Sequence, residues 1–303
     1  MRAIAAPIFI TTLSLISGIS QAADTVNRTL TLDAAGLEAL EVKAGAGSLD
    51  IQGVRGAETI TVEAVIQADL DDVILSLEKR GDKAVLTSEI DDKVRISWGW
   101  NNSPKIDLKV TLPQSLLLAV NDGSGDMSVR DMENDVDIND GSGSLEIENI
   151  GGNLDLIDGS GDLRIESVAG NISINDGSGG VRIVRVGGSV EGNDGSGDFS
   201  AEHVTGGIQL TDGSGNLRLQ DIGGSIDLND GSGDISIENI VGDISIVDGS
   251  GTIRVKTVDG HVEIHDGSGD IIVAGVTRGL KVGESGSGAV RTDNIQGDLI
   301  IDD

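Results

Sequence analysis

The chain has 303 residues and a formal net charge of −30 at pH 7, with 51 acidic and 21 basic side chains. This surplus argues against nucleic acid and anionic lipid as partners and leaves cations or basic surfaces open. The chain contains no cysteine, which excludes disulfides and thiolate chemistry, and its three histidines argue against a histidine-rich metal site.

The first 22 residues predict a secretory signal peptide. Arg2 precedes an apolar stretch, Ala3–Ile19, and small residues at Ser20 and Ala22 suit cleavage after Ala22. The apolar stretch is too short for a stable membrane anchor, no cysteine follows it for lipid attachment, and no later stretch reads as a membrane span. We therefore expect an exported protein that resides in the periplasm, with surface display or secretion left open.

Residues 23–121 predict a β-rich N-terminal cap together with the first coils of the fold. Runs such as ETITVEAVI, KAVLTSEI and KIDLKVTL alternate apolar and polar residues, as strands do. The stretch AGAGSLDIQGVRG (44–56) matches DGSGSLEIENIGG (140–152) in the later repeat. We expect this segment to begin the same architecture and to cover its first edge, which would otherwise expose unpaired strand groups.

The stretch SWGWNNSP (97–104) contains both tryptophans of the chain, Trp98 and Trp100. Exposed tryptophans suit sugar stacking or a protein partner, so both are candidate ligand or partner residues. The alternative is that they pack over the end of the fold.

From residue 122 to residue 303 the sequence predicts ten repeats of about 18 residues. The motif DGSG begins at Asp122, Asp140, Asp158, Asp176, Asp194, Asp212, Asp230, Asp248 and Asp266, and a tenth copy begins with SGSG at Ser285. In DGSGDLRIESVAGNISIN (158–175), aliphatic residues at positions six, eight, eleven, fifteen and seventeen alternate with polar ones. Two short strands and two corners predict one coil, and stacked coils bury a continuous aliphatic core. The expected fold is all-β, a single-stranded β-solenoid (β-helix) with 18-residue coils.

The repeat also predicts local features of the coils. Glycine recurs at position thirteen, which indicates a left-handed corner there. The residue before each motif aspartate is often asparagine and sometimes aliphatic, which suggests a partly inward site with stacked amides. Phe199 is expected to fill space left by Ala201 and by Gly192 of the preceding coil, so that core volume is conserved.

The chain resembles a known family in the order of its parts. A GAGS opening, a strand-rich insert, the run VTLP (110–113) and then many DGSGD-L-x-I units are similar to the bacterial "putative adhesin" family. The resemblance covers nearly all of the mature chain. It implies an exported β-solenoid domain of unknown function, related to the head domains of auto-transporter adhesins. It transfers no functional residue to this sequence.

Stacked corners would place the nine DGSG aspartates, Asp122 to Asp266, in one ladder with a spacing of about 5 Å. Bare carboxylates at this distance repel by ~1 kcal/mol per pair even in water. Three outcomes are open: the side chains cap the turns, they bind a hard cation such as Ca²⁺, or they turn outward into water. The nine aspartates are therefore candidate cation ligands, and Ca²⁺ is the candidate ion.

Two outward faces differ in charge. Position seven is often arginine and position nine is often acidic, which predicts a charge-paired surface on one sheet. Position sixteen, on the opposite sheet, is acidic at Asp137, Asp155, Glu191, Asp227 and Glu263. This second face is the more acidic one and is a candidate binding surface.

The sequence predicts a non-enzymatic cell-envelope protein, an adhesin-like interaction scaffold that presents acidic repetitive faces. No residues form a recognisable catalytic arrangement, and we expect no cofactor. An envelope protein or a glycan is the expected partner class, and we expect a monomer. Two alternatives remain open: a Ca²⁺-binding β-solenoid scaffold, and a glycan-processing β-helix enzyme, which would need a local cleft lined with carboxylates and aromatic residues.

Overall fold

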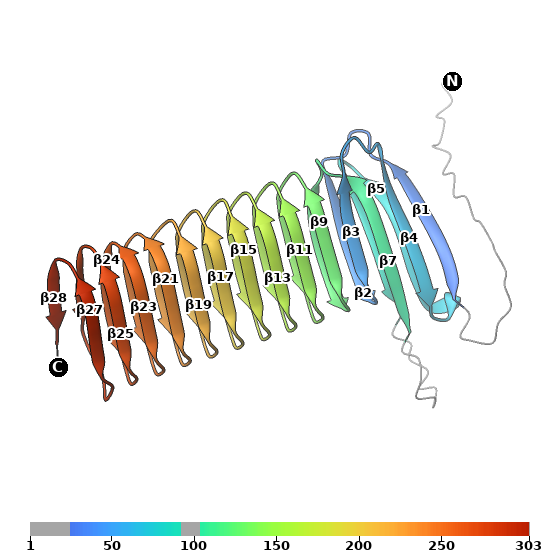
Figure 1. The fold of residues 1–303 in the computed structure, drawn as a ribbon. Coiled ribbons are helices and arrows are strands. Elements are labelled where there is room, and N and C mark those ends of the chain that lie inside the picture. The colour runs from blue at the N-terminus through green and yellow to red at the C-terminus, as the bar shows by residue number, and fades with distance from the viewer. Residues whose placement is uncertain (1–24, 92–103, 303) are drawn as a thin grey trace, which may run out of the picture.

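The computed structural model describes residues 25–91 and 104–302. Its strands form two 14-stranded sheets that lie one behind the other along the molecule (Figure 1). In spatial order, the first sheet contains β1 (Val26–Asp33), β4 (Thr59–Gln67), β7 (Lys105–Pro113), β3 (Leu49–Val54), β9 (Met127–Met132), β11 (Leu145–Ile150), β13 (Leu163–Val168), β15 (Val181–Val186), β17 (Phe199–Val204), β19 (Leu217–Ile222), β21 (Ile235–Val241), β23 (Ile253–Asp259), β25 (Ile271–Val276) and β27 (Val290–Ile295). The second contains β5 (Val73–Arg80), β6 (Lys83–Ile90), β2 (Ala39–Ala46), β8 (Leu117–Ser124), β10 (Val136–Asp140), β12 (Leu154–Asp158), β14 (Ile172–Asp176), β16 (Val190–Asp194), β18 (Ile208–Asp212), β20 (Ile226–Asp230), β22 (Ile244–Asp248), β24 (His261–Asp266), β26 (Gly279–Val282) and β28 (Asp298–Ile301). One short 3₁₀ turn, η1 (Leu70–Asp72), precedes β5.

Each 18-residue repeat contributes one strand to each sheet, in parallel register with the equivalent strand of the next repeat. Ile165 lies opposite Ile183, and two coils further along, Ala201 lies opposite Leu219. Equivalent residues therefore stack along one axis. This confirms the predicted all-β solenoid with 18-residue coils and two strands per coil.

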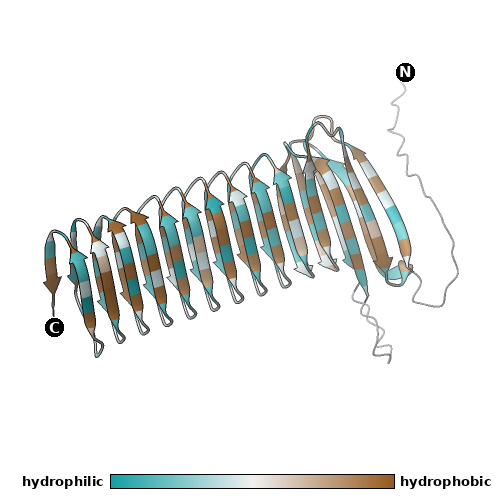
Figure 2. Ribbon diagram, in the orientation of Figure 1, coloured by the Kyte–Doolittle hydropathy of each residue, from teal (hydrophilic) through white to brown (hydrophobic). Residues whose placement is uncertain are grey.

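The core is a column of aliphatic side chains between the two sheets. Strands of the second sheet alternate buried and exposed residues, as in β14. In the first sheet, hydrophobic and hydrophilic residues form bands along the strands (Figure 2). Phe199 is 1% exposed and thus buried, as predicted. A Cβ on Gly192 would lie 3.9 Å from the Phe199 ring and only 2.8 Å from Leu210. The missing side chain of Gly192 therefore leaves space that both neighbours occupy.

The expectation of a left-handed residue at position thirteen is wrong for most coils. Among the position-thirteen glycines from Gly152 to Gly260, only Gly242 has a positive φ, 150°. The left-handed residue is at position ten instead, for example Ser167 at φ 64°. Glycine at position thirteen is required by stacking, because a Cβ on Gly170 would lie 2.5 Å from the carbonyl oxygen of Gly152.

The N-terminal part joins the solenoid through the coil that its sequence predicted. β3 pairs with β9 in parallel, Leu49 opposite Met127, and β2 pairs with β8, Ala44 opposite Asp122. Beyond this coil, β1, β4 and β7 pair antiparallel, as do β5 and β6. The N-terminal part is thus β-rich, and in it the parallel stacking gives way to antiparallel strand pairs, of which β5 and β6 form a hairpin.

The C-terminal coil is the last described layer. The register between neighbouring coils changes from 18 residues at Ile264 and Val282 to 19 at Ile271 and Val290, so the tenth copy has one extra residue between Val282 and Val290. No coil covers β28 in the described chain, and Leu299 is 49% exposed. None of the described residues forms a helix that is long and apolar enough to cross a membrane.

Candidate functional site

The nine DGSG aspartates form a ladder inside the molecule, here called the aspartate ladder (Asp122, Asp140, Asp158, Asp176, Asp194, Asp212, Asp230, Asp248 and Asp266). Each is 1–4% exposed. In most coils the aspartate is the last residue of a strand of the second sheet, and it lies opposite the aspartate of the next coil, as Asp158 lies opposite Asp176. The alternation that buries Ile172 and Ile174 continues to Asp176, which explains why the carboxyl points inward.

Turn capping, the first of the three predicted outcomes, occurs in four coils. Oδ1 of an aspartate accepts a hydrogen bond of 2.9–3.1 Å from the backbone N–H of the serine two residues later at Asp194, Asp230, Asp248 and Asp266. The other oxygen of these four, and both oxygens of the other five aspartates, have no hydrogen-bond partner in the described chain. The third of the open outcomes, in which the carboxyls turn outward into water, does not occur, because all nine are buried.

Burial raises the pKa of the ladder carboxyls. The pKa rises from 3.8 to about 7 at Asp194 and Asp230, with repulsion from the neighbouring aspartates as the second cause. At Asp140 and Asp176 it rises to about 6 for the same two reasons. Because desolvation and like charge both favour the neutral acid, part of the ladder holds protons near neutral pH.

The residue before each ladder aspartate faces outward, so the prediction of a partly inward site is wrong. Asn175 is exposed, and the aliphatic replacements Ile157 and Val247 are 52% and 49% exposed. Strand alternation explains the result, since a residue adjacent to an inward carboxyl must point to the other face. At one step, Asn193 donates a side-chain hydrogen bond of 3.4 Å to Asn175, which is the expected contact between stacked amides.

Several acidic residues on the outer face of the first sheet pair with basic side chains. Arg164 forms an ion pair of 2.7 Å with Glu166, and Lys256 forms one of 2.9 Å with Glu238. Arg185 also pairs with Glu166 from the next coil. Glu166 and Glu238 therefore already have basic partners within the chain, whereas Glu148 forms no ion pair with any described residue.

The outer face of the second sheet carries a different pattern at position sixteen, here called the acidic row (Asp155, Ser173, Glu191, Gln209, Asp227, Ser245 and Glu263). These residues lie opposite one another in consecutive strands. From Asp155 to Glu263, carboxylates occupy every second strand, which separates them by ~9.6 Å, twice the usual spacing of ~4.8 Å. The alternation ends at Asp137, the remaining acidic residue at position sixteen, which lies directly opposite Asp155 on the neighbouring strand. Asp155, Glu191 and Asp227 form no ion pair with any described residue, whereas Glu263 pairs with Lys281 at 2.7 Å.

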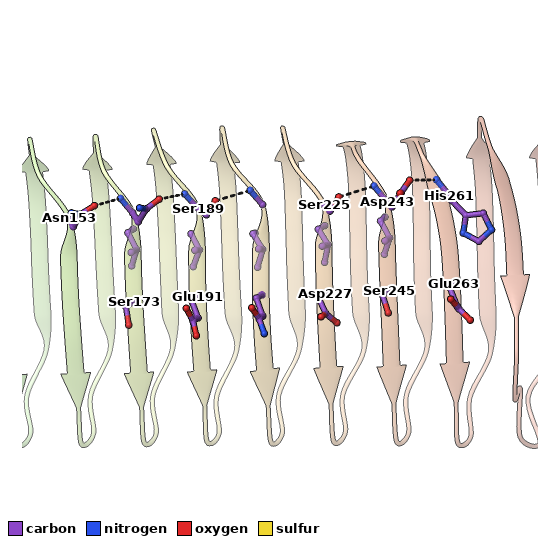
Figure 3. Close-up of a pocket in the computed structure, with 18 of the residues that line it drawn as sticks. Asn153, Ser173, Ser189, Glu191, Ser225, Asp227, Asp243, Ser245, His261 and Glu263 are labelled. Carbon is purple, nitrogen blue, oxygen red and sulfur yellow. Dashed lines mark hydrogen bonds between the residues drawn. The ribbon is translucent and has the colours of Figure 1, made fainter.

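A shallow groove lies along the acidic row (Figure 3). Its rim is the row at position fourteen, where a side-chain oxygen accepts a hydrogen bond from the backbone N–H of the next coil, as from Asn171 to Asn153 at 2.9 Å and from Ser189 to Asn171 at 2.9 Å. Buried aliphatic residues such as Ile172 lie between the two rows. The acidic row and this rim together are called the acidic groove. The acidic residues of this groove were predictable from the sequence, whereas their alternation and the rim were not predicted.

The histidines do not form a catalytic arrangement in the described chain. The side chains of Glu202, His203 and Asp221 lie within 4.8 Å of one another. The two ring nitrogens of His203 face different carboxylates, Glu202 at 3.5 Å and Asp221 at 3.4 Å. Trp98 and Trp100, the predicted ligand or partner residues, lie outside the described residues.

The chain matches one known protein family in sequence and resembles several solved structures at low sequence identity. A sequence model of the Toastrack family, DUF4097, matches residues 57–222. No curated protein matches the chain. Similar solved structures include a putative cell adhesion protein from Clostridium sporogenes (10% identity, TM-score 0.34, covering 71% of this chain and 99% of that one) and putative adhesins from Parabacteroides merdae (14%, 0.33, 89% and 95%) and Bacteroides fragilis (12%, 0.32, 94% and 100%).

Structural likeness at this level carries no functional argument, and the fold rests on the strands and register of this chain. The family match is different, because it spans more than half of the chain and agrees with the resemblance predicted from the sequence. We conclude that the protein belongs to the Toastrack DUF4097 family.

Proposed function

We propose that the protein is a non-enzymatic, exported scaffold of the cell envelope that binds a positively charged partner along the acidic groove. One observation carries the proposal: Asp155, Glu191 and Asp227 have no cation beside them in the described chain, whereas Glu166 and Glu238 on the other sheet do. Unpaired charges held on a rigid sheet are available to a complementary surface.

The regularity of the coils supports a scaffold over an enzyme. Glycan-processing sites need carboxylic acids with tuned pKa values beside the substrate. The ladder aspartates have raised pKa values, but they are 1–4% exposed and lie beneath the sheet, where a glycan cannot reach them. The acidic groove instead repeats one environment along several strands. Residues 1–22, the predicted signal peptide, support export.

A binding experiment on envelope extract tests this proposal. The mature chain, residues 23–303, is immobilised as wild type and as the double variant Glu191→Gln, Asp227→Asn. The matched control, Glu146→Gln with Glu238→Gln, removes two charges from the first sheet. At low salt we expect wild type and control to retain the same basic proteins. The groove variant should lose them, because it lacks the two carboxylates that are expected to contact the basic side chains.

Two outcomes would contradict the proposed function. One is retention of the same proteins by the groove variant and by wild type. The other is an equal loss by the control variant, which would make net charge, and not the groove, the cause.

A second candidate function is Ca²⁺ binding by the aspartate ladder, the alternative raised from the sequence. It is favoured by the buried carboxylate oxygens without hydrogen-bond partners, for example at Asp122 and Asp212. If Ca²⁺ binds the folded chain only, millimolar Ca²⁺ raises the melting temperature relative to chelator. Equal melting temperatures at pH 7.5 with Ca²⁺ and with chelator would eliminate this candidate.

A further inference from the structure

We propose that the acidic groove binds an extended polypeptide in the polyproline II conformation with a lysine or arginine at every third residue. The inference rests on the proposed function and names the class of its partner. It starts from the acidic row, where carboxylates at Asp155, Glu191, Asp227 and Glu263 occupy alternate strands.

The spacing of the carboxylates selects the conformation of the partner. Alternate strands lie ~9.6 Å apart. A polyproline II helix rises ~3.1 Å per residue and has three residues per turn, so every third side chain returns to the same face after ~9.3 Å. The mismatch of ~0.3 Å per step accumulates to only ~0.9 Å over the three steps between Asp155 and Glu263.

Other extended or helical partners fit the row less well. In a β-strand, side chains on one face recur every ~6.8 Å, and every third residue points to the opposite face. An α-helix returns to the same face after seven residues, or ~10.5 Å, which drifts by almost 3 Å over the same three steps. A glycan would be expected to stack on aromatic rings, and no described residue lining the groove is Phe, Tyr or Trp.

The neutral residues of the groove suit the backbone of such a partner. Ser173, Gln209 and Ser245 stand between the carboxylates and can each donate and accept hydrogen bonds. Figure 3 shows Ser173 and Ser245 in this row. A polyproline II chain has no internal hydrogen bonds, so its carbonyl groups are free to accept them. The acidic row thus offers, in alternation, a carboxylate for a basic side chain of the peptide and a hydrogen-bond donor for its backbone carbonyl groups. A peptide with one basic residue followed by two other residues presents its groups in this order.

Two labelled peptides of identical composition test the inference. One contains five Lys-Pro-Pro units, and the other has the same five lysines in one block followed by the ten prolines. Fluorescence anisotropy at low ionic strength measures their Kd for the mature chain. We expect the regular peptide to bind at least about tenfold more tightly than the block peptide. Its Kd should weaken about tenfold with Glu191→Gln, Asp227→Asn and stay within about twofold with Glu146→Gln, Glu238→Gln.

The outcomes separate this inference from the proposed function. Equal Kd values for the two peptides, or the absence of binding by both, overturn the spacing argument. If retention of envelope proteins still depends on Glu191 and Asp227 in that case, the proposed function stands and the partner is of another class. If that dependence is lost as well, both proposals fall.

Discussion

Two rows of acidic side chains follow the second sheet, one beneath it and one above it, and they obey different rules. The aspartate ladder has a carboxyl in nine consecutive coils, all buried. The acidic row has carboxylates only on alternate strands from Asp155 to Glu263, with Asp137 opposite Asp155 as the one exception at position sixteen, and its members are exposed or half-buried. Acidic and neutral residues also alternate at position five of the repeat, directly after the DGSG motif, with Asp162, Gly180 and Asp198 in successive coils.

The difference shows what charge state each row can hold. Like charges opposite one another on neighbouring strands repel, and an exposed row avoids this when neutral residues separate its charges. An unbroken buried row is compatible with the fold when some of its carboxyls hold a proton, which the raised pKa values at Asp194 and Asp230 support. We infer that the inner row is a structural, proton-holding ladder and that the outer row is the charged surface.

The largest expected effect is a loss of stability as pH rises. The ladder carboxyls have pKa values of up to about 7 in the folded chain and an ordinary value of 3.8, so folding takes up protons between these limits. The free energy of unfolding should therefore fall between about pH 4 and pH 7 and level off above. Since each pKa unit corresponds to about 1.4 kcal/mol, we expect a total fall of several kcal/mol from pH 5 to pH 8 in urea titrations.

At acidic pH, the free energy of unfolding should change in the opposite direction and rise with pH. A hydrogen bond from the backbone N–H of Ala289 lowers the pKa of Asp270, so this carboxylate stabilises the fold above its ordinary pKa and loses that contribution as pH falls. Maximum stability is expected near pH 4–5. A maximum at pH 7–8 would contradict a neutral ladder.

A single amide in the ladder should reproduce part of this effect. Asp194→Asn keeps the size of the side chain and an oxygen that can accept the hydrogen bond from Ser196, but it cannot ionise. At pH 8 we expect the variant to be more stable than wild type by on the order of 1 kcal/mol, and at pH 5 nearly equal to it.

The matched control for this substitution is Asp227→Asn in the acidic row. It should change stability by less than about 0.5 kcal/mol at either pH, as surface substitutions usually do. Destabilisation of Asp194→Asn at pH 8 would show that the ladder needs the charged carboxylate.

Filling the gaps of the acidic row gives the smallest expected effect. Ser173→Asp with Gln209→Glu makes carboxylates consecutive on the outer face, so we expect destabilisation by a few tenths of a kcal/mol at low salt. High salt should restore stability by screening, whereas the neutral control Ser173→Asn, Gln209→Asn should show no salt-dependent difference. No loss at low salt would remove repulsion as the reason for the alternation.

The sequence was sufficient to predict the fold because the 18-residue period is a property of the chain. Stacking places Ile165 and Ile183 opposite each other, and the match of residues 44–56 to the repeat correctly predicted their place in a coil. Phe199 could be predicted as buried because its neighbours Ala201 and Gly192 lose volume.

The remaining features depend on contacts between coils. The glycine at position thirteen indicated a local φ preference, but Gly170 is required by the carbonyl of Gly152 above it, which no local rule describes. The inward direction of Asp176 could have been predicted by extending the strand alternation two residues past Ile174. The alternation of the acidic row has a period of two coils, so a search at a period of 18 residues does not reveal it.

Infrared spectroscopy of the carboxyl groups tests the contrast between the two rows most directly. The carboxylic-acid C=O stretch of the folded mature chain is followed from pH 3 to pH 9, with the urea-unfolded chain as reference. We predict that the folded chain retains a carboxylic-acid band at pH 6 that the unfolded chain lacks, and that Asp194→Asn reduces it while Asp227→Asn does not. Complete loss of the band by pH 5 in the folded chain would show that the buried ladder is ionised and would contradict the account.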